Sequence, residues 1–199
     1  MPLPISGGLI PPILSPLLPD DTVDQKSLHH LVEHIMTGGG TGIFVLGSTG
    51  EGALLSLGQR RTIIGVKDSY GDMARFQRLL RLCGQGDFAI FQGTQRVAGL
   101  SLLAGADGLV PGLANLAPSW FAEMIEAAGL HQVERVLDIQ KRIVALWTLQ
   151  SHSTHWLGCL KVAANLLGLC GTTVSAPLPK LSEGEVANVK GVLEQAGLM

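Results

Sequence analysis

The spacing of short apolar runs is the feature that most constrains the fold of this chain. Runs rich in glycine and β-branched residues occur within residues 1–130, at 8–14, 42–47, 62–67, 88–93 and 108–111. Segments with apolar residues at helical spacing lie between most of them, at 23–36, 72–82, 95–104 and 118–128. Because strand-like runs alternate with helix-like segments, the sequence predicts a parallel sheet covered by helices.

The remainder of the chain has the pattern of helices only. Residues 132–149, 157–167 and 183–196 have helical spacing, and 172–181, which contains two prolines, is typical of an extended connector. A chain of 199 residues can bury one substantial core. We therefore expect these helices to pack on the same domain as the sheet.

Composition and charge exclude several classes of protein. The net charge is −2, so the chain lacks the basic surface that a nucleic-acid partner requires. No apolar run approaches the roughly 18–20 residues of a membrane span, and the N-terminal residues lack a signal-peptide pattern. Cys83, Cys159 and Cys170 are odd in number and have no CxxC spacing. We therefore expect reduced, structural thiols and a cytoplasmic protein.

Lys67 ends the apolar run 62–67 and is the first candidate for chemistry. In parallel sheets and barrels, the carboxyl ends of the strands form the active-site edge. An amine that is partly desolvated there has a lowered pKa and can attack a carbonyl as a neutral nucleophile. From this run alone, a solvated lysine at the mouth of a strand is the alternative.

A glycine- and hydroxyl-rich turn is the second candidate. Gly47, Ser48 and Thr49 directly follow a predicted strand, and their backbone N–H groups and hydroxyls could hold a carboxylate or a phosphate. Small residues also suit any tight turn between strand and helix. If both strands are parallel, this turn and Lys67 lie at the same edge, which is the arrangement needed to form an imine with a 2-oxo acid.

Other motifs accompany these two in order along the chain: Gly7-Gly8-Leu9-Ile10-Pro11-Pro12, Gly65-Val66-Lys67-Asp68, Gly105-Ala106-Asp107-Gly108, Ala114-Asn115 and Leu160-Lys161-Val162-Ala163-Ala164. The set resembles the dihydrodipicolinate synthase and N-acetylneuraminate lyase family. That resemblance implies a pyruvate-dependent class I aldolase on a (β/α)8 barrel with extra C-terminal helices. It implies that Lys67 is the Schiff-base lysine, that residues 47–49 bind the carboxylate, and that Val110 contacts the keto acid through its backbone. It implies no metal and no organic cofactor.

The chain departs from this family by its length. A (β/α)8 barrel has eight strands and about 250 residues, whereas five strands are expected here. The residues before Arg60-Arg61-Thr62 resemble the family up to the helix after its second strand, and the residues after this point resemble the family from its sixth strand onwards. The family's third, fourth and fifth strands are therefore expected to be missing. We therefore expect an α/β fold, an incomplete (β/α)8 barrel with about five parallel strands. Residues 1–130 would form the partial barrel, and residues 131–199 a C-terminal helical extension on the same domain.

The missing segment would carry the family's proton-relay tyrosine and an arginine for the second substrate. The single tyrosine, Tyr70, matches neither. Loss of a positioned acid or base typically costs about 10²–10⁴-fold in rate, so we expect an impaired aldolase acting on pyruvate and an aldehyde. The resemblance also implies a homodimer or homotetramer. A non-catalytic keto-acid-binding or assembly protein, or an inactive internal-deletion product, remains the alternative.

Other polar motifs have simpler interpretations. His30 and His34 have i, i+4 spacing but no HExxH order, so a surface cluster is expected in place of a zinc site. The pair His152 and His155 is interpreted in the same way. Lys161 lies in an apolar helix and is expected to be structural, with its amine reaching towards solvent.

Overall fold

The structure is a computed structural model of the chain, and it describes residues 8–19, 24–43, 65–83, 89–153 and 155–199. Four strands within these residues form one parallel sheet with the order β1-β4-β3-β2. They are β1 (Gly8–Leu9), β2 (Gly65–Asp68), β3 (Ala89–Gln92) and β4 (Gly108–Leu109). The first of these strands pairs with the last, as the strands of a barrel do.

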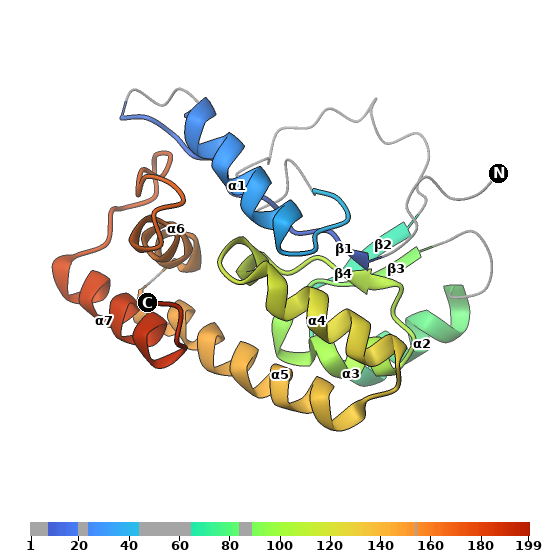
Figure 1. Cartoon of the computed structure of the whole chain (residues 1–199). Coiled ribbons are helices and arrows are strands. Elements are labelled where there is room, and N and C mark those ends of the chain that lie inside the picture. Colours follow the sequence, from blue (N-terminus) through green and yellow to red (C-terminus); the bar gives the residue numbers. More distant parts are fainter. Residues whose placement is uncertain (1–7, 20–23, 44–64, 84–88, 154) are drawn as a thin grey trace.

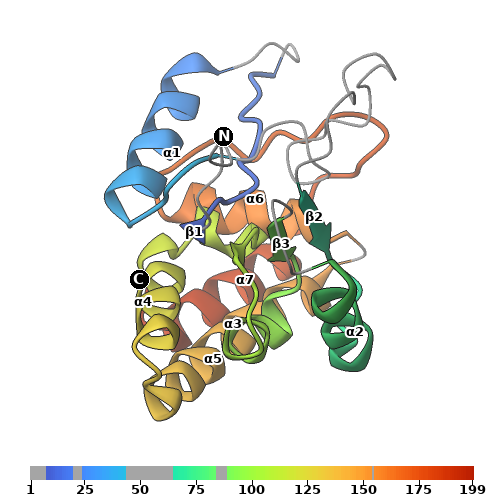
Figure 2. The ribbon, with the colours of Figure 1, turned by 90° about the vertical axis from the view of Figure 1, so that its right-hand side faces the viewer.

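Helices follow the strands and continue to the C-terminus. The α-helices are α1 (Gln25–Thr37), α2 (Met73–Cys83), α3 (Ala98–Leu103), α4 (Pro118–Gly129), α5 (Val133–Trp147), α6 (Trp156–Leu166) and α7 (Glu183–Gln195). Short 3-10 helices are η3 (Gln95–Val97), η4 (Gly112–Asn115) and η5 (Thr148–His152). Helices α2, α3 and α4 lie on one side of the sheet, and α5 extends beyond them to α6 and α7 (Figure 1). Helices α1 and α2 lie at opposite ends of the sheet (Figure 2).

The predicted strand at 8–14 is wrong beyond Leu9. The backbone N–H of Ile10 still donates to the Leu109 carbonyl at 3.0 Å, but the next two residues are prolines and have no N–H to donate. The buried side chain of Asn115 then holds this segment. Its Oδ1 accepts from Leu14 N at 3.1 Å, and its Nδ2 donates to the Pro12 carbonyl at 2.7 Å.

The other predicted elements agree with the structure to within a few residues where it describes them. Helix α1 begins after Asp24, whose carboxylate accepts from the Ser27 N–H at 3.0 Å and so caps the helix. Strand β4 is shorter than the predicted run 108–111. Of the predicted strand 42–47, residues 44–47 lie outside the described residues, as do 62–64 of the run that contains Lys67.

Glycines in and before β4 allow this strand to approach β1 closely. A side chain at Gly108 would collide with the carbonyl oxygen of Gly8 on β1, so this position requires glycine. Gly105 has a φ of 103°, which suits the turn after α3. The carboxylate of Asp107 accepts from the Ile90 N–H at 2.7 Å and so ties this loop to β3. The motif 105–108 is therefore required by strand geometry.

The side of the sheet covered by helices contains the main core. Leu9 and Leu109 are 1% and 0% exposed and belong to one large apolar cluster with residues of α4, α5, α6 and α7. Gln92 lies on the same side, and its buried amide donates to Ser101 Oγ on α3 at 2.9 Å. Gln140 of α5 is bonded to the Gly99 N–H at 2.7 Å and to the Gln95 carbonyl at 2.9 Å, which fixes α5 against the start of α3.

Lys161 is structural, as predicted, but its amine does not reach solvent. The residue is 0% exposed, and its Nζ donates to the Thr173 carbonyl at 2.6 Å. The connector after α6 folds back over the helix and supplies this acceptor, so the charged group is hydrogen-bonded inside the protein. None of the described helices combines the length and the apolar character needed to cross a membrane.

Candidate functional site

Lys67 projects from the side of the sheet opposite to the main core. In the register of the sheet, Lys67 pairs with Phe91 of β3, and Phe91 pairs with Gly108 of β4. Because paired residues share a face and alternate residues return to it, Lys67, Phe91 and Val110 all face the same way. Phe91 and Val110 are buried in a small apolar cluster with Ala89, against which Ile10 packs. This face corresponds to the interior of a barrel.

Burial and a close backbone approach define the surroundings of the Lys67 amine. Desolvation by burial lowers its pKa from the ordinary value of 10.5. Its aliphatic chain lies across the backbone of Gly93, where a Cβ would collide with Lys67 Cε and with Ser69 Oγ. A lowered pKa increases the share of the neutral amine, which is the nucleophilic form. The burial of Lys67 therefore favours the neutral form of its amine.

A cavity of about 320 Å³ opens beside this lysine. Residues from two sources line it. The ends of β2 and β3 and the loops that follow contribute Lys67, Ser69, Gly93, Thr94, Gln95 and Arg96, while Gly112, Trp147, Gln150 and Trp156 come from η4 and from the corner between α5 and α6. The charged residues of this lining are Lys67 and Arg96, and within the described chain no acidic side chain lines it. The cavity therefore has positive charge and hydrogen-bonding groups next to a candidate nucleophile.

The structure describes Val110 and Tyr70 but not the predicted carboxylate-binding turn. Val110 is 4% exposed, and its N–H donates to the Gln92 carbonyl at 2.9 Å. Val110 shares the face of Lys67 but does not line the cavity. Gly47, Ser48 and Thr49 lie outside the described residues. Tyr70 is 67% exposed, with the Arg75 guanidinium 4.8 Å from the centre of its ring.

Sequence reasoning gave a role in the site to Lys67 alone among the residues that line this cavity, and Gln95, Arg96, Trp147 and Trp156 are among those it missed. Gln95 and Arg96 had a usable signal, because they follow β3 directly and strand ends of a parallel sheet share one edge. We assigned the segment 95–104 to a helix and gave its first residues no other role. The two tryptophans come from distant helices, and no sequence spacing brings them to the end of β2 and β3.

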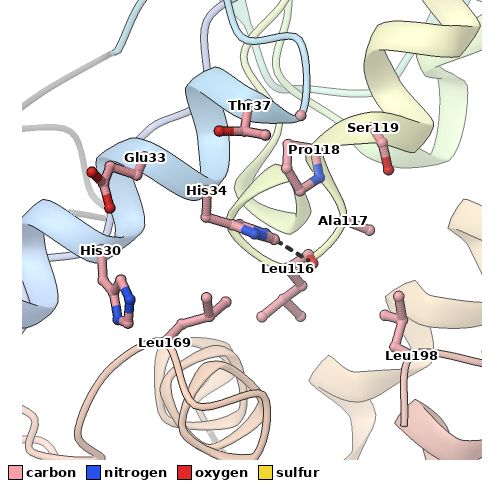
Figure 3. Close-up of a pocket in the computed structure, with 11 residues that line it drawn as sticks. His30, Glu33, His34, Thr37, Leu116, Ala117, Pro118, Ser119, Leu169 and Leu198 are labelled. Atoms are coloured by element: carbon pink, nitrogen blue, oxygen red, sulfur yellow. Dashed lines mark hydrogen bonds between the residues drawn. The ribbon is translucent and has the colours of Figure 1, made fainter.

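A second, larger pocket of about 510 Å³ lies between α1, the start of α4 and the C-terminal residues. His30, Glu33, His34 and Thr37 enter it from α1 (Figure 3). His34 Nε2 is 3.3 Å from the Leu116 carbonyl oxygen, and burial lowers the pKa of His34. In the described part of the chain, no three His, Cys, Asp or Glu side chains are close enough to hold a metal ion. Of the histidines of α1, His34 is half-buried, whereas His29 and His30 are exposed.

Comparison with known sequences identifies relatives of this chain. The sequence profile of the Dihydrodipicolinate synthetase family matches residues 5–64 and 56–196, and the two matches overlap around the predicted junction at 60–62. The 4-hydroxy-tetrahydrodipicolinate synthases of Acidovorax sp. and Kosmotoga olearia are 32% and 30% identical over 73% and 81% of this chain. These matches cover 48% and 54% of the two relatives. The chain thus spans about half the length of the curated relatives it matches.

Comparison with solved structures shows the fold. Dihydrodipicolinate synthase from Bacteroides thetaiotaomicron has a TM-score of 0.87 at 23% identity, covering 98% of this chain and 100% of that one. A prophage protein of the dihydrodipicolinic acid synthase family from E. coli K12, solved in complex with pyruvate, has a TM-score of 0.88 at 17% identity, covering 97% and 99%. The prediction of an α/β fold of the incomplete (β/α)8 barrel type is confirmed.

Proposed function

Because this chain belongs to the Dihydrodipicolinate synthetase family, we propose that it is a Schiff-base-forming, pyruvate-dependent aldolase or lyase in which Lys67 is the nucleophile. The observation that carries the proposal is the lowered pKa of an amine at the carboxyl end of a parallel strand, beside a cavity. Pyruvate or a related 2-oxo acid is the first substrate, and an aldehyde is the second. The chemistry needs no metal or organic cofactor, because the protonated imine accepts the electrons.

The reaction begins at the neutral amine. Lys67 Nζ attacks the keto carbon, a carbon–nitrogen bond forms, and loss of water gives a protonated imine. Loss of a proton from the adjacent methyl group gives an enamine, whose carbon then adds to the aldehyde to form the new carbon–carbon bond. Water hydrolyses the resulting imine and releases product and free amine. In the cleavage direction, the same steps run in reverse.

The carboxylate of the keto acid needs its own binding groups. We propose that Gly47, Ser48 and Thr49 hold it with backbone N–H groups and hydroxyls, as the resemblance implies. The Val110 carbonyl would contact the bound acid, as the resemblance implies, and the Val110 side chain shares the face of Lys67. Holding the carboxylate places the keto carbon within reach of the amine, which is how orientation contributes to the rate.

We further propose that turnover is slow. The tyrosine and the arginine of the family's middle segment have no counterparts in this chain, and Tyr70 is exposed on the loop after β2. Without a positioned acid or base, proton transfer to and from the imine loses about 10²–10⁴-fold in rate. A protein that keeps the imine but lacks turnover would be a keto-acid-binding or assembly protein. We propose a cytoplasmic location and a homodimer or homotetramer, as the resemblance implies.

Trapping with borohydride tests this function. The protein is incubated with pyruvate and sodium borohydride, digested, and analysed by peptide mass spectrometry. We expect a reduced pyruvate adduct on the peptide that contains Lys67, and none on that peptide in Lys67→Arg. Turnover with an aldehyde, measured in parallel, separates an enzyme from a binding protein. A folded protein that gives no adduct at Lys67 would exclude both functions.

A further inference from the structure

His155 precedes α6 and forms a hydrogen bond through each of its two ring nitrogens. The backbone N–H of Gly158 donates to Nδ1 at 3.1 Å, so the side chain caps the helix. Nε2 lies 2.8 Å from the carbonyl oxygen of Pro179, which belongs to the connector between α6 and α7. This histidine therefore joins the first turn of α6 to a residue 24 positions further along the chain.

These two hydrogen bonds are compatible with a single protonation state of the ring. The Pro179 carbonyl can only accept, so Nε2 carries a hydrogen, and the Gly158 N–H can only donate, so Nδ1 carries none. A protonated imidazole has hydrogens on both nitrogens, so it keeps the bond to Pro179 but cannot accept from Gly158. Its charge also meets the positive end of the helix dipole. Protonation of His155 therefore removes the cap of α6.

The charged groups around His155 act on this protonation in the opposite direction. Hydrogen bonds from two serines lower the pKa of Glu185 in the first turn of α7, and attraction to His155 lowers it further. Glu185 therefore favours the charged ring, whereas the cap favours the neutral ring. The titratable neighbours in the sequence are His152, three residues earlier, and Lys180, directly after Pro179. Neither forms an ion pair within the described part of the chain.

The first turn of α6 also forms a wall of the cavity beside Lys67. Trp156 follows His155 directly and lines this cavity. Two atoms of its ring lie 3.2 and 3.3 Å from the position of a Cβ at Gly112, so the ring packs on the segment after β4. The helix is buried from residue 157 to residue 164, and this burial does not depend on the cap. Loss of the cap therefore loosens one turn and the tryptophan within it.

We propose that His155 is an acid-sensitive latch, which holds Trp156 in the wall of the cavity while its ring is neutral and releases the first turn of α6 when its ring is protonated. Histidine is the side chain that changes its charge in mildly acidic to neutral solution. Release of the tryptophan admits water to the Lys67 amine, and hydration favours the charged form of that amine. Acid then slows imine formation beyond the titration of the lysine itself, and this consequence rests on the proposed function, whereas the latch does not.

Hydrogen exchange tests the latch without any substrate. Exchange of the backbone amides at the start of α6 is measured by mass spectrometry over a pH series and corrected for the intrinsic pH dependence. We expect protection to fall by about 2–30-fold as pH decreases, the factor that corresponds to one helix cap. In His155→Asn, protection should stay constant, because the asparagine side chain caps helices and does not titrate. An equal fall in both proteins, or no fall in the unchanged protein, would overturn the proposal.

Two further variants assign the effect to particular side chains. Glu185→Gln keeps an acceptor for the capping box of α7 but removes the charge that attracts protonated His155. The fall in protection should therefore move to lower pH. His152→Asn is the control, because His152 bonds neither Gly158 nor Pro179, and its pH dependence should equal that of the unchanged protein. An unmoved or higher pH in Glu185→Gln, or loss of the pH dependence in His152→Asn, would contradict the assignment.

Pyruvate trapping tests the effect of the latch on Lys67. The rate of borohydride adduct formation is compared between the unchanged protein and His155→Asn over the same pH series. Both proteins contain the same lysine and the same His34, so the titrations of those residues cancel in the ratio of the two rates. We expect a ratio near one in mildly alkaline solution and a ratio lower by at least about twofold in acid.

The possible failures of these experiments are distinguishable. A constant ratio of trapping rates, with the expected exchange result, would overturn the coupling between the latch and the cavity. Absence of an adduct at every pH in both proteins would exclude the proposed imine chemistry. The exchange experiment would still decide whether His155 holds the first turn of α6, because it involves neither a keto acid nor the nucleophile.

Discussion

The side chain of Lys67 lies across the backbone of Gly93, at the carboxyl ends of two paired strands. The Gly93 N–H donates to the Asp68 carbonyl at 2.7 Å, so the backbone at residue 93 is held close to the strand that carries the lysine. Glycine at 93 leaves the space that the methylene groups of Lys67 occupy. The direction in which the amine points therefore depends on the residue that directly follows the neighbouring strand β3.

Gly93→Ala should displace the lysine and slow imine formation. The added methyl would collide with Lys67 Cε and Ser69 Oγ, both of which are side-chain atoms that can move. We expect the rate of pyruvate trapping to fall by at least about tenfold, since a displacement of about 1 Å can cost about 100-fold. Gly129→Ala is the control, because nothing lies within 4 Å of its Cβ position. Equal trapping rates in the two variants would show that the contact with Gly93 does not position the amine.

The amine of Lys67 should lose its proton at lower pH than the amine of Lys141. Burial lowers the pKa of Lys67, whereas the hydrogen bond to Asp138, at 2.8 Å, raises the pKa of Lys141. The neutral fraction of Lys67 therefore increases first as pH rises. Competitive acetylation at a series of pH values, read by peptide mass spectrometry, gives both titrations. Coincident midpoints, or an earlier midpoint for Lys141, would argue against a desolvated Lys67.

The buried position of His34 should make the protein less stable in mild acid. Burial lowers the pKa of His34 below its ordinary 6.5, so the unfolded chain binds more protons between the lowered value and about 6.5. The contribution of His34 to the free energy of unfolding is complete above that window and is lost as pH falls through it. Urea denaturation at several pH values should show a shallower pH dependence in His34→Gln. His29→Gln, on the exposed side of α1, is the control, and an unchanged slope in His34→Gln would contradict the prediction.

His155 should stabilise the C-terminal helices and, through them, the whole domain. Its Nδ1 accepts from the Gly158 N–H at 3.1 Å at the start of α6, and its Nε2 donates to the Pro179 carbonyl, with the two atoms 2.8 Å apart. His155→Ala should lower the free energy of unfolding by about 0.5–2 kcal/mol. We propose that residues 131–199 pack on the same domain as residues 1–130. Urea should therefore unfold the variant in a single transition, with its midpoint at a lower urea concentration. His155→Asn, which can restore the cap, should recover part of the loss. Two separate transitions in urea would show that the helices form an independent unit.

The sequence alone was sufficient to predict most of the described elements and to propose Lys67 as a candidate nucleophile. The alternation of apolar runs and helical spacing is a local property, so it located β2, β3 and most of the helices before any contact was known. It failed at residues 10–14, where prolines remove backbone donors and a side chain from residue 115 replaces a partner strand. Hydrogen bonds between residues that are far apart in the sequence produce no periodic pattern in it, so they cannot be predicted from such a pattern.

The tertiary structure decided what surrounds Lys67. Sequence order separates Lys67 from Trp147 and Trp156, yet the tertiary fold places all three around one cavity. The lowered pKa of the lysine likewise results from burial. A sequence determines which chemical groups are available and which local structures they favour. Distances and burial depend on how distant segments pack, and these determine which groups act together.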